Sequence, residues 1–306
     1  MNIQEILKTF EYCGISYELL DVGDGWTIAV TQHGGHIFGP FSEQYPEGLF
    51  WIPDSIRDKD SYKELIDNKI WNIGGDRVWI APEIQFNIRD RSRYRESLDT
   101  PKTIDPGCFS MVRRQDAICL EQSLDLSGTS EENIFAEAWN LLQVRTGGIL
   151  FIPMYTPVRG TDHYALAGDH EYPVERGICL KPTGDSQYKI AYKSAVLTGR
   201  FGYMKESGTE QSYLIVINYP NNPSAMYSEE PPQPELAGDT GYSIHIYNDD
   251  DKSGGFAEME CNMQTIGRPT GISRSVDRLT TWIFSGSKER LKEAARLLLG
   301  YEFPEI

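Results

Sequence analysis

Charged and aromatic side chains crowd into one short segment, between residues 71 and 83. Two indoles, Trp71 and Trp79, stand on either side of a glycine pair and an Asp-Arg pair, and a glutamate closes the segment. An indole can stack on the apolar face of a pyranose ring, while guanidinium and carboxylate groups bind its hydroxyls through paired hydrogen bonds. The segment therefore predicts a sugar-binding cleft; a turn between strands with a surface ion pair is the alternative. The predicted binding residues are Asp76, Arg77, Trp79 and Glu83.

Two glutamates near the C-terminus are the candidates for a catalytic base. Glu258 and Glu260 follow Phe256 in an alternating run that predicts a β-strand, so both carboxylates would point to one face. A carboxylate pair is unfavourable beside an apolar core and suits a ligand site, whereas a solvent-exposed face is the alternative. We expect Glu258 to be the general base, with Glu260 as the second candidate.

Two histidines are the candidates for a general acid that would donate a proton while the glutamate accepts one. His163 and His170 each follow an aspartate, which is also typical of a loop turn with exposed side chains. The spacing of these Asp-His pairs is too unspecific to predict a metal site. The sequence contains no P-loop, GxSxG or dinucleotide-binding fingerprint. We therefore expect neither a metal nor a cofactor.

A basic segment stands out in a chain whose formal net charge is −16. Its arginines, together with Arg77, could bind an anionic sugar such as a uronate or a sugar phosphate, although a surface ion-pair network explains them equally well. The acidic balance argues against nucleic acid or an anionic membrane as partner. No apolar run approaches the ~20 residues of a membrane-spanning helix. The expected partner is a small-molecule sugar or oligosaccharide. The arginines of this segment are Arg89, Arg91, Arg93 and Arg95.

Strands are the elements expected to position these residues. Short β-branched and aromatic runs alternate with turns rich in glycine, proline and asparagine, without helices between them, which is typical of an antiparallel sandwich or barrel. Short helices are expected at residues 3–10, near 60–68, and from Ser287 to Gly300. The expected strands include residues 26–30, 117–120, 149–152, 188–196, 213–217 and 242–247.

The organisation of the chain predicts one domain over residues 1–306, because neither a repeat nor a low-complexity linker interrupts it. Residues 229–238 are the segment most clearly expected to be a loop, and Asp249–Asp251 is expected to be a solvated hairpin tip. The five cysteines form no CxxC pair, and no secretory signal is visible, so we expect reduced thiols and a cytoplasmic location.

Several segments resemble the galactose-mutarotase-like (aldose 1-epimerase-like) superfamily, in one of its less-studied branches. Residues 30–40 (VTQHGGHIFGP) resemble the family's opening strand, and residues 74–83 (GGDRVWIAPE) are similar to the block that follows it. Residues 138–153 resemble a Trp…Gln…Gly-Gly…Pro run of the same superfamily. Residues 188–191 and 256–260 extend the resemblance, which covers most of the chain.

The resemblance implies an all-β fold, an antiparallel β-supersandwich with a few short peripheral helices, that binds carbohydrate in its concave face. In the family's enzymes it also implies an isomerase reaction without a cofactor, in which a base takes the O1 proton and an acid protonates the ring oxygen. The stretch at 135–144, where active members have a histidine, has none here. A non-catalytic carbohydrate-binding or sensing protein is therefore the alternative, and a glycoside hydrolase or lyase is a third. The resemblance adds Trp139, Asn140, Gln143 and Lys189 as expected sugar-binding residues.

Overall fold

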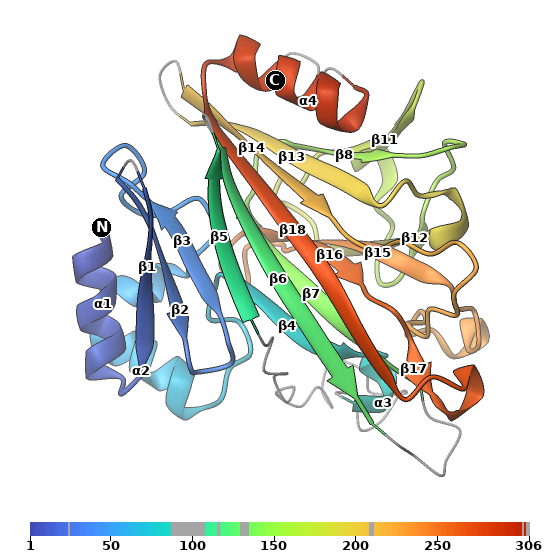
Figure 1. Ribbon diagram of the computed structural model, residues 1–306, viewed down its shortest axis with the longest axis horizontal. Coiled ribbons are helices and arrows are strands. Elements are labelled where there is room, and N and C mark those ends of the chain that lie inside the picture. Colours follow the sequence, from blue (N-terminus) through green and yellow to red (C-terminus); the bar gives the residue numbers. More distant parts are fainter. Residues whose placement is uncertain are drawn as a thin grey trace.

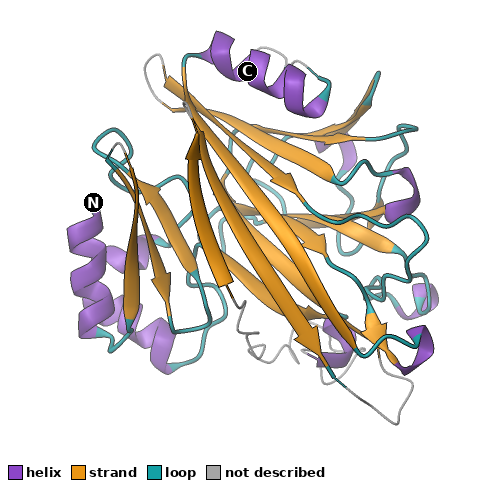
Figure 2. Cartoon of the chain, in the orientation of Figure 1, coloured by secondary structure: helices purple, strands orange, loops and turns teal. Residues whose placement is uncertain are grey.

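Two antiparallel sheets dominate the computed structural model (Figure 1). It describes residues 1–23, 25–86, 108–114, 117–128, 135–207, 211–301 and 303. The sheets pack face to face around a shared apolar core, and the helices lie at the periphery (Figure 2). The all-β antiparallel sandwich with a few peripheral helices is therefore confirmed. One domain over residues 1–306 stays a prediction.

The larger sheet positions the candidate site. Its strands follow the order β1-β2-β3-β4-β7-β16-β15-β12-β9, and β17 pairs with β7. The strand expected at 188–196 ends at Lys193, since residues 194–196 form a short 3-10 turn, η4 (Ser194–Val196). The strands are β1 (Tyr17–Gly23), β2 (Trp26–Thr31), β3 (Ile37–Phe41), β4 (Asp76–Ala81), β7 (Phe135–Arg145), β9 (Thr161–Asp162), β12 (Tyr188–Lys193), β15 (Tyr242–Asn248), β16 (Phe256–Asn262) and β17 (Ile266–Gly267).

The second sheet closes the other side of the core, with the strand order β10-β11-β8-β13-β14-β18-β6-β5. Three of the sequence-predicted strands lie in it, and the one expected at 117–120 extends to Ser127. The strands are β5 (Cys108–Arg114), β6 (Ala117–Ser127), β8 (Ile149–Pro153), β10 (Glu171–Val174), β11 (Gly177–Leu180), β13 (Arg200–Ser207), β14 (Gln211–Asn218) and β18 (Arg274–Gly286).

Side-chain alternation divides the larger sheet into a core face and an outer face. Leu142, Met259, Ile246 and Ile190 form one row across β7, β16, β15 and β12. All four are buried in the core between the sheets. Because successive side chains of a strand point to opposite faces, the residue next to each of them points away from this core. That outer face carries the candidate site.

The helices cover the edges of the sandwich. The first, α1 (Ile3–Tyr12), begins with a capping box between Asn2 and Glu5 and packs with α2 (Lys59–Asp67) beside β2 and β3. The last, α4 (Lys288–Leu299), lies between the N-cap Ser287 and the C-cap Gly300 and packs on the second sheet. These three helices confirm the sequence prediction. None of the helices in the described part of the chain combines the length and apolar character needed to cross a bilayer.

Candidate functional site

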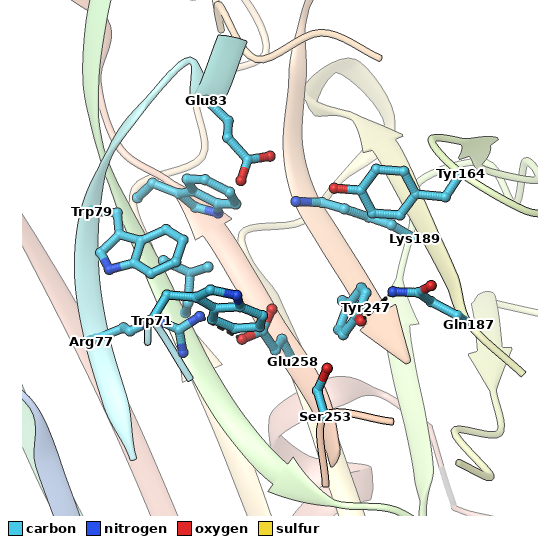
Figure 3. Close-up of a pocket in the computed structure, with 12 residues that line it drawn as sticks. Trp71, Arg77, Trp79, Glu83, Tyr164, Gln187, Lys189, Tyr247, Ser253 and Glu258 are labelled. Carbon is cyan, nitrogen blue, oxygen red and sulfur yellow. Dashed lines mark hydrogen bonds and ion pairs between the residues drawn. The ribbon is translucent and has the colours of Figure 1, made fainter. Parts of the chain in front are cut away.

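A cavity of about 200 Å³ lies on the outer face of the larger sheet (Figure 3). Adjacent strands β4, β7, β16, β15 and β12 form its floor, and loops beside them supply its walls. One lining residue, Glu83, starts the short helix α3 (Glu83–Phe86) directly after β4. The lining residues are Trp71, Arg77, Trp79, Glu83, Trp139, Leu141, Tyr164, Gln187, Lys189, Tyr247, Ser253 and Glu258.

The pairing register of the strands brings these side chains together. Tyr247 lies opposite Glu258 on one side and opposite Lys189 on the other. Trp79 and Trp139 are paired in the same way between β4 and β7. Because paired residues of neighbouring strands share a face, distant segments of the sequence meet around one cavity.

Arg77 and Glu258 form a buried ion pair at the cavity, with 2.6 Å between Nη2 and Oε1. Gln143 donates a second hydrogen bond to the same carboxylate oxygen, at 3.0 Å. The guanidinium lies 4.4 Å from the ring centroid of Trp79 and 5.3 Å from that of Trp71, within cation–π range. Its Nε and Nη1 atoms have no hydrogen-bond partner among the described residues. The ion pair with Glu258 and the two indoles thus fix the position of the Arg77 guanidinium at the cavity.

A second buried ion pair joins Lys189 to Glu260, with 3.0 Å between Nζ and Oε2. The ammonium also lies 4.4 Å from the ring centroid of Trp139. Burial lowers the pKa of Lys189, but the negative charges of Glu260 and its neighbours outweigh it, so the pKa is raised. Burial raises the pKa of Glu260 to about 7 against the lowering influence of Lys189. Lys189 is therefore a cation held at the cavity wall.

Glu83 points its carboxylate into the cavity from the side opposite Glu258 (Figure 3). Its backbone N–H donates to Glu229 at 2.7 Å. Glu229 belongs to the segment 229–238 expected as a loop, and only 1% of it is exposed. Burial and the charge of Glu83 raise the pKa of Glu229 well above the ordinary range. The loop thus contributes a buried carboxyl that supports the cavity wall.

The glycine pair of the opening motif allows the chain to pass close to other backbone. Gly74 and Gly75 both have positive φ, +96° and +84°. A Cβ atom on Gly75 would lie 2.5 Å from the carbonyl oxygen of Ile37, and one on Gly74 would lie 2.9 Å from that of Trp51. Glycine is therefore required here by backbone packing as well as by conformation.

Six of the sequence-predicted residues line the cavity, namely Arg77, Trp79, Glu83, Trp139, Lys189 and Glu258. Gln143 does not line it but holds Glu258 through a hydrogen bond. Glu260 shares the outer face with Glu258 and is fully buried, so the solvent-exposed alternative for this pair is wrong. The roles of these residues in binding or catalysis stay predictions.

Asp76 and Asn140 do not reach the cavity. Their side chains point between the two sheets, where Asp76 accepts hydrogen bonds from Asn140 at 2.5 Å and from Gln122 of β6 at 2.8 Å. The sequence prediction grouped them with their neighbours Arg77 and Trp139, whereas adjacent strand residues point to opposite faces. Both are placed as structural polar groups of the core.

The two candidate histidines also lie outside the cavity lining. His163 is buried against Tyr242 and His245, and burial lowers its pKa to about 3, so it is neutral. His170 stacks on Tyr188 within hydrogen-bonding distance of Ser186. The expectation of exposed loop histidines is wrong for His163, because the residue follows β9 and packs inward. Neither histidine is positioned as the proton donor of this cavity.

The hairpin between β15 and β16 supplies a lining residue that the sequence prediction missed. Asp249 is fully buried instead of solvated, and its carboxylate accepts backbone hydrogen bonds from Ser253 and Gly255. These bonds place Ser253 at the cavity edge. Tyr247 could have been found from period-two alternation, whereas no local pattern marks Tyr164 or Gln187. The basic segment, Arg89 to Arg95, lies outside the described residues.

Potential metal ligands are not gathered in the described part of the chain, since no group of three or more His, Cys, Asp or Glu side chains there is arranged to hold a metal ion. The expectation that the site needs neither a metal nor a cofactor stays a prediction. The chemistry available at this cavity comes from two carboxylates, two cations and five aromatic rings.

Comparison with known proteins finds no matching family model and no matching curated protein. Among solved structures, the chain is similar to a galactose mutarotase-like protein from Lactobacillus casei ATCC 334, with 10% identity, a TM-score of 0.46 and coverage of 88% of this chain and 100% of the other. It is also similar to a galactose mutarotase related enzyme from Lactobacillus acidophilus, with 8% identity, a TM-score of 0.44 and coverage of 89% and 98%. At these values the likeness assigns no residue, ligand or activity to this chain. Both solved structures bear the name of the superfamily that the sequence motifs resemble.

Proposed function

We propose that the cavity binds a monosaccharide and exchanges its anomers, with Glu258 as the general base. Aromatic walls formed by Trp71, Trp79 and Trp139 suit the apolar faces of a sugar ring, and the charged groups between them suit its hydroxyls. Drug-sized ligands occupy pockets of about 300–1,000 Å³. The cavity of about 200 Å³ is smaller, so a single sugar ring is a better fit than an oligosaccharide.

The observation that carries this proposal is the fixed carboxylate of Glu258. Arg77 and Gln143 both bind Oε1, whereas Oε2 has neither a hydrogen bond nor an ion pair with any residue that the structure describes. A carboxylate with one oxygen fixed and the other turned to the substrate can take the O1 proton of a bound sugar. Ring opening, rotation about the C1–C2 bond and reclosure then exchange the anomers.

The direct test is anomer exchange measured by NMR. D-glucose and D-galactose labelled with ¹³C at C1 would be incubated with the protein, and exchange between the α and β signals would be followed. We expect exchange well above the spontaneous rate for at least one sugar, together with saturable binding. If the protein neither binds these sugars nor accelerates their exchange, the proposal is overturned.

A second candidate is a non-catalytic sugar-binding or sensing protein. It is favoured by the cavity lining, in which the described residues include no histidine, and by the ion pair that already engages Glu258. The same experiment distinguishes the two functions, because a sensor would bind the sugar without accelerating exchange.

A cytoplasmic location also stays a prediction. It is supported by four free thiols, those of Cys13, Cys119, Cys179 and Cys261.

A further inference from the structure

We propose that Lys189 is the proton donor of this site and that Glu260 is the residue that positions it. The inference rests on the proposed function, because it names the acid that anomer exchange requires. Lys189 extends from β12 toward the cavity centre, on the wall across from Arg77 (Figure 3). Its Nζ atom lies 3.0 Å from Glu260 and over the ring of Trp139, which fixes the direction of the ammonium.

The two glutamates of β16 have different roles: Glu258 is the proposed base, and Glu260 positions the proposed acid. Glu258 is paired with Arg77 of β4, and Glu260 is paired with Lys189 of β12. Arg77 cannot serve as the acid, because a guanidinium is not deprotonated in proteins. An ammonium carries three N–H donors. Lys189 can therefore keep its ion pair while a second N–H meets a substrate oxygen.

The other groups of the cavity are less suited to this role. The hydroxyl of Tyr247 is engaged by Gln187 and Asp249, at 2.6 and 3.2 Å. Donation by Tyr164 would leave a buried phenolate beside the carboxylates of Glu83 and Glu260, whereas a lysine that donates becomes a neutral amine. Glu83 is the competing donor, since its carboxylate also faces the cavity. The experiment below therefore separates Lys189 from Glu83.

The proposed step balances without a co-reactant. Glu258 takes the proton from O1 as the C1–O1 bond becomes a carbonyl. The C1–O5 bond breaks with its electron pair on O5, and O5 takes a proton from the Lys189 ammonium. Reclosure on the opposite face returns one proton to Lys189 and one to O1, so both residues regain their starting state.

The surroundings of Lys189 determine when it can donate. The ionisable groups that face it from the packed elements are Glu260 of β16, Glu83 of α3, Glu229 of the 229–238 loop, Tyr164 and His163 after β9, and His245 of β15. Burial and the positive charge of Lys189 lower the pKa of both His245 and His163. Both histidines are therefore neutral near pH 7. The acidic groups raise the pKa of Lys189 and keep it protonated.

The test compares Lys189→Arg with Glu83→Gln, using ¹³C1-labelled D-glucose and D-galactose. Arginine keeps the positive charge but does not release a proton, so exchange should fall by about 10²–10⁴-fold while sugar affinity changes little. Lys63→Arg on α2 is the matched control, because Lys63 is a partly exposed helix residue that pairs with Asp67 and does not line the cavity. Near-wild-type exchange in Lys189→Arg, or its loss in Glu83→Gln alone, would overturn the inference.

The role of Glu260 is tested by the pH profile of exchange. Glu260→Gln removes the charge that raises the pKa of Lys189, so the alkaline limb of the profile should move to lower pH, whereas Glu260→Asp should restore it. The wild-type profile needs no variant: an ammonium donor predicts activity that persists past pH 8, and an alkaline limb below pH 7 would overturn the assignment. Wild-type protein that exchanges no sugar would instead overturn the proposed function, and this inference with it.

Discussion

Arg77 and Glu258 meet across an intervening strand, since β7 separates β4 from β16, and 181 positions separate the two residues in the sequence. Both side chains point to the outer face of the sheet, so they meet above β7, with 2.6 Å between Nη2 of Arg77 and Oε1 of Glu258. The carboxylate is therefore fixed by the sheet itself and not by a loop. The predictions below depend on this arrangement.

Replacing Glu258 by glutamine should abolish anomer exchange and leave sugar binding detectable. The amide keeps the shape of the side chain but cannot take a proton, so we expect a loss of about 10²–10⁴-fold in the exchange rate. NMR exchange and calorimetric binding with the same sugar measure the two effects. Glu18→Gln on β1, an exposed site, is the control. Exchange at the wild-type rate in Glu258→Gln would reject this carboxylate as the base.

Replacing Arg77 by methionine should strongly destabilise the protein. The change leaves Glu258 buried without its cation, and breaking a buried pair in this way costs about 3–5 kcal/mol in the free energy of unfolding. The double variant Arg77→Met with Glu258→Gln should lose less than the sum of the single changes, because it removes both charges. Urea unfolding of all four proteins gives the coupling energy. Strict additivity would show that the two side chains do not depend on each other.

A neutral sugar should bind at least as well as its uronate. Both cations of the described lining, Arg77 and Lys189, already lie beside a carboxylate, so the described cavity holds no unbalanced positive charge for an anion. Isothermal titration of D-glucose and D-glucuronate would be carried out at low and at physiological salt, where the Debye length falls from about 30 Å to about 8 Å. Tighter binding of glucuronate that weakens with salt would implicate the segment from Arg89 to Arg95.

Replacing Asp76 by asparagine should change the pH dependence of stability without changing sugar binding. Burial raises the pKa of Asp76 from 3.8 to about 7, although hydrogen bonds from Asn140 and Gln122 lower it. A carboxyl whose pKa is raised on folding binds its proton more tightly in the native state, so its stabilising contribution is present below pH 4 and is lost as the pH rises to about 7. Thermal unfolding between pH 4 and pH 8 should show a smaller decline for Asp76→Asn than for wild type. An equal decline in both proteins, or lost sugar binding, would contradict this placement.

The sequence was sufficient to predict the strands and the charged cluster but not the face each residue occupies. Period-two alternation correctly placed Glu258 and Glu260 together, because both lie on one strand. It could not say whether Asp76 or Arg77 faces the cavity, since adjacent residues differ only in the direction that the sheet's packing gives them. The same limit applies to Trp139 and Asn140, which the motif listed together and the sheet separates.

Residues brought in by tertiary structure were the least predictable. Tyr164 follows a two-residue strand, and Glu229 lies in a segment rich in proline and acids that has the composition of an exposed loop. Packing between segments far apart in the sequence leaves Tyr164 half-buried and Glu229 buried, both next to Lys189 and Glu83. Composition reports the average environment of a segment and cannot indicate which one of its side chains will turn inward.

Hydrogen bonds from Trp51 and Asn72, far away in the sequence, hold the hairpin that carries Ser253. Asn72 donates a hydrogen bond to the carbonyl of Ser253 at 2.7 Å, and the indole of Trp51 donates to that of Gly254 at 3.2 Å. This hairpin is therefore already held in place before any ligand arrives, and little of its chain entropy remains to be lost on binding. Sugar binding should then show no slow phase from closure of this hairpin, which acts as a rigid part of the receptor.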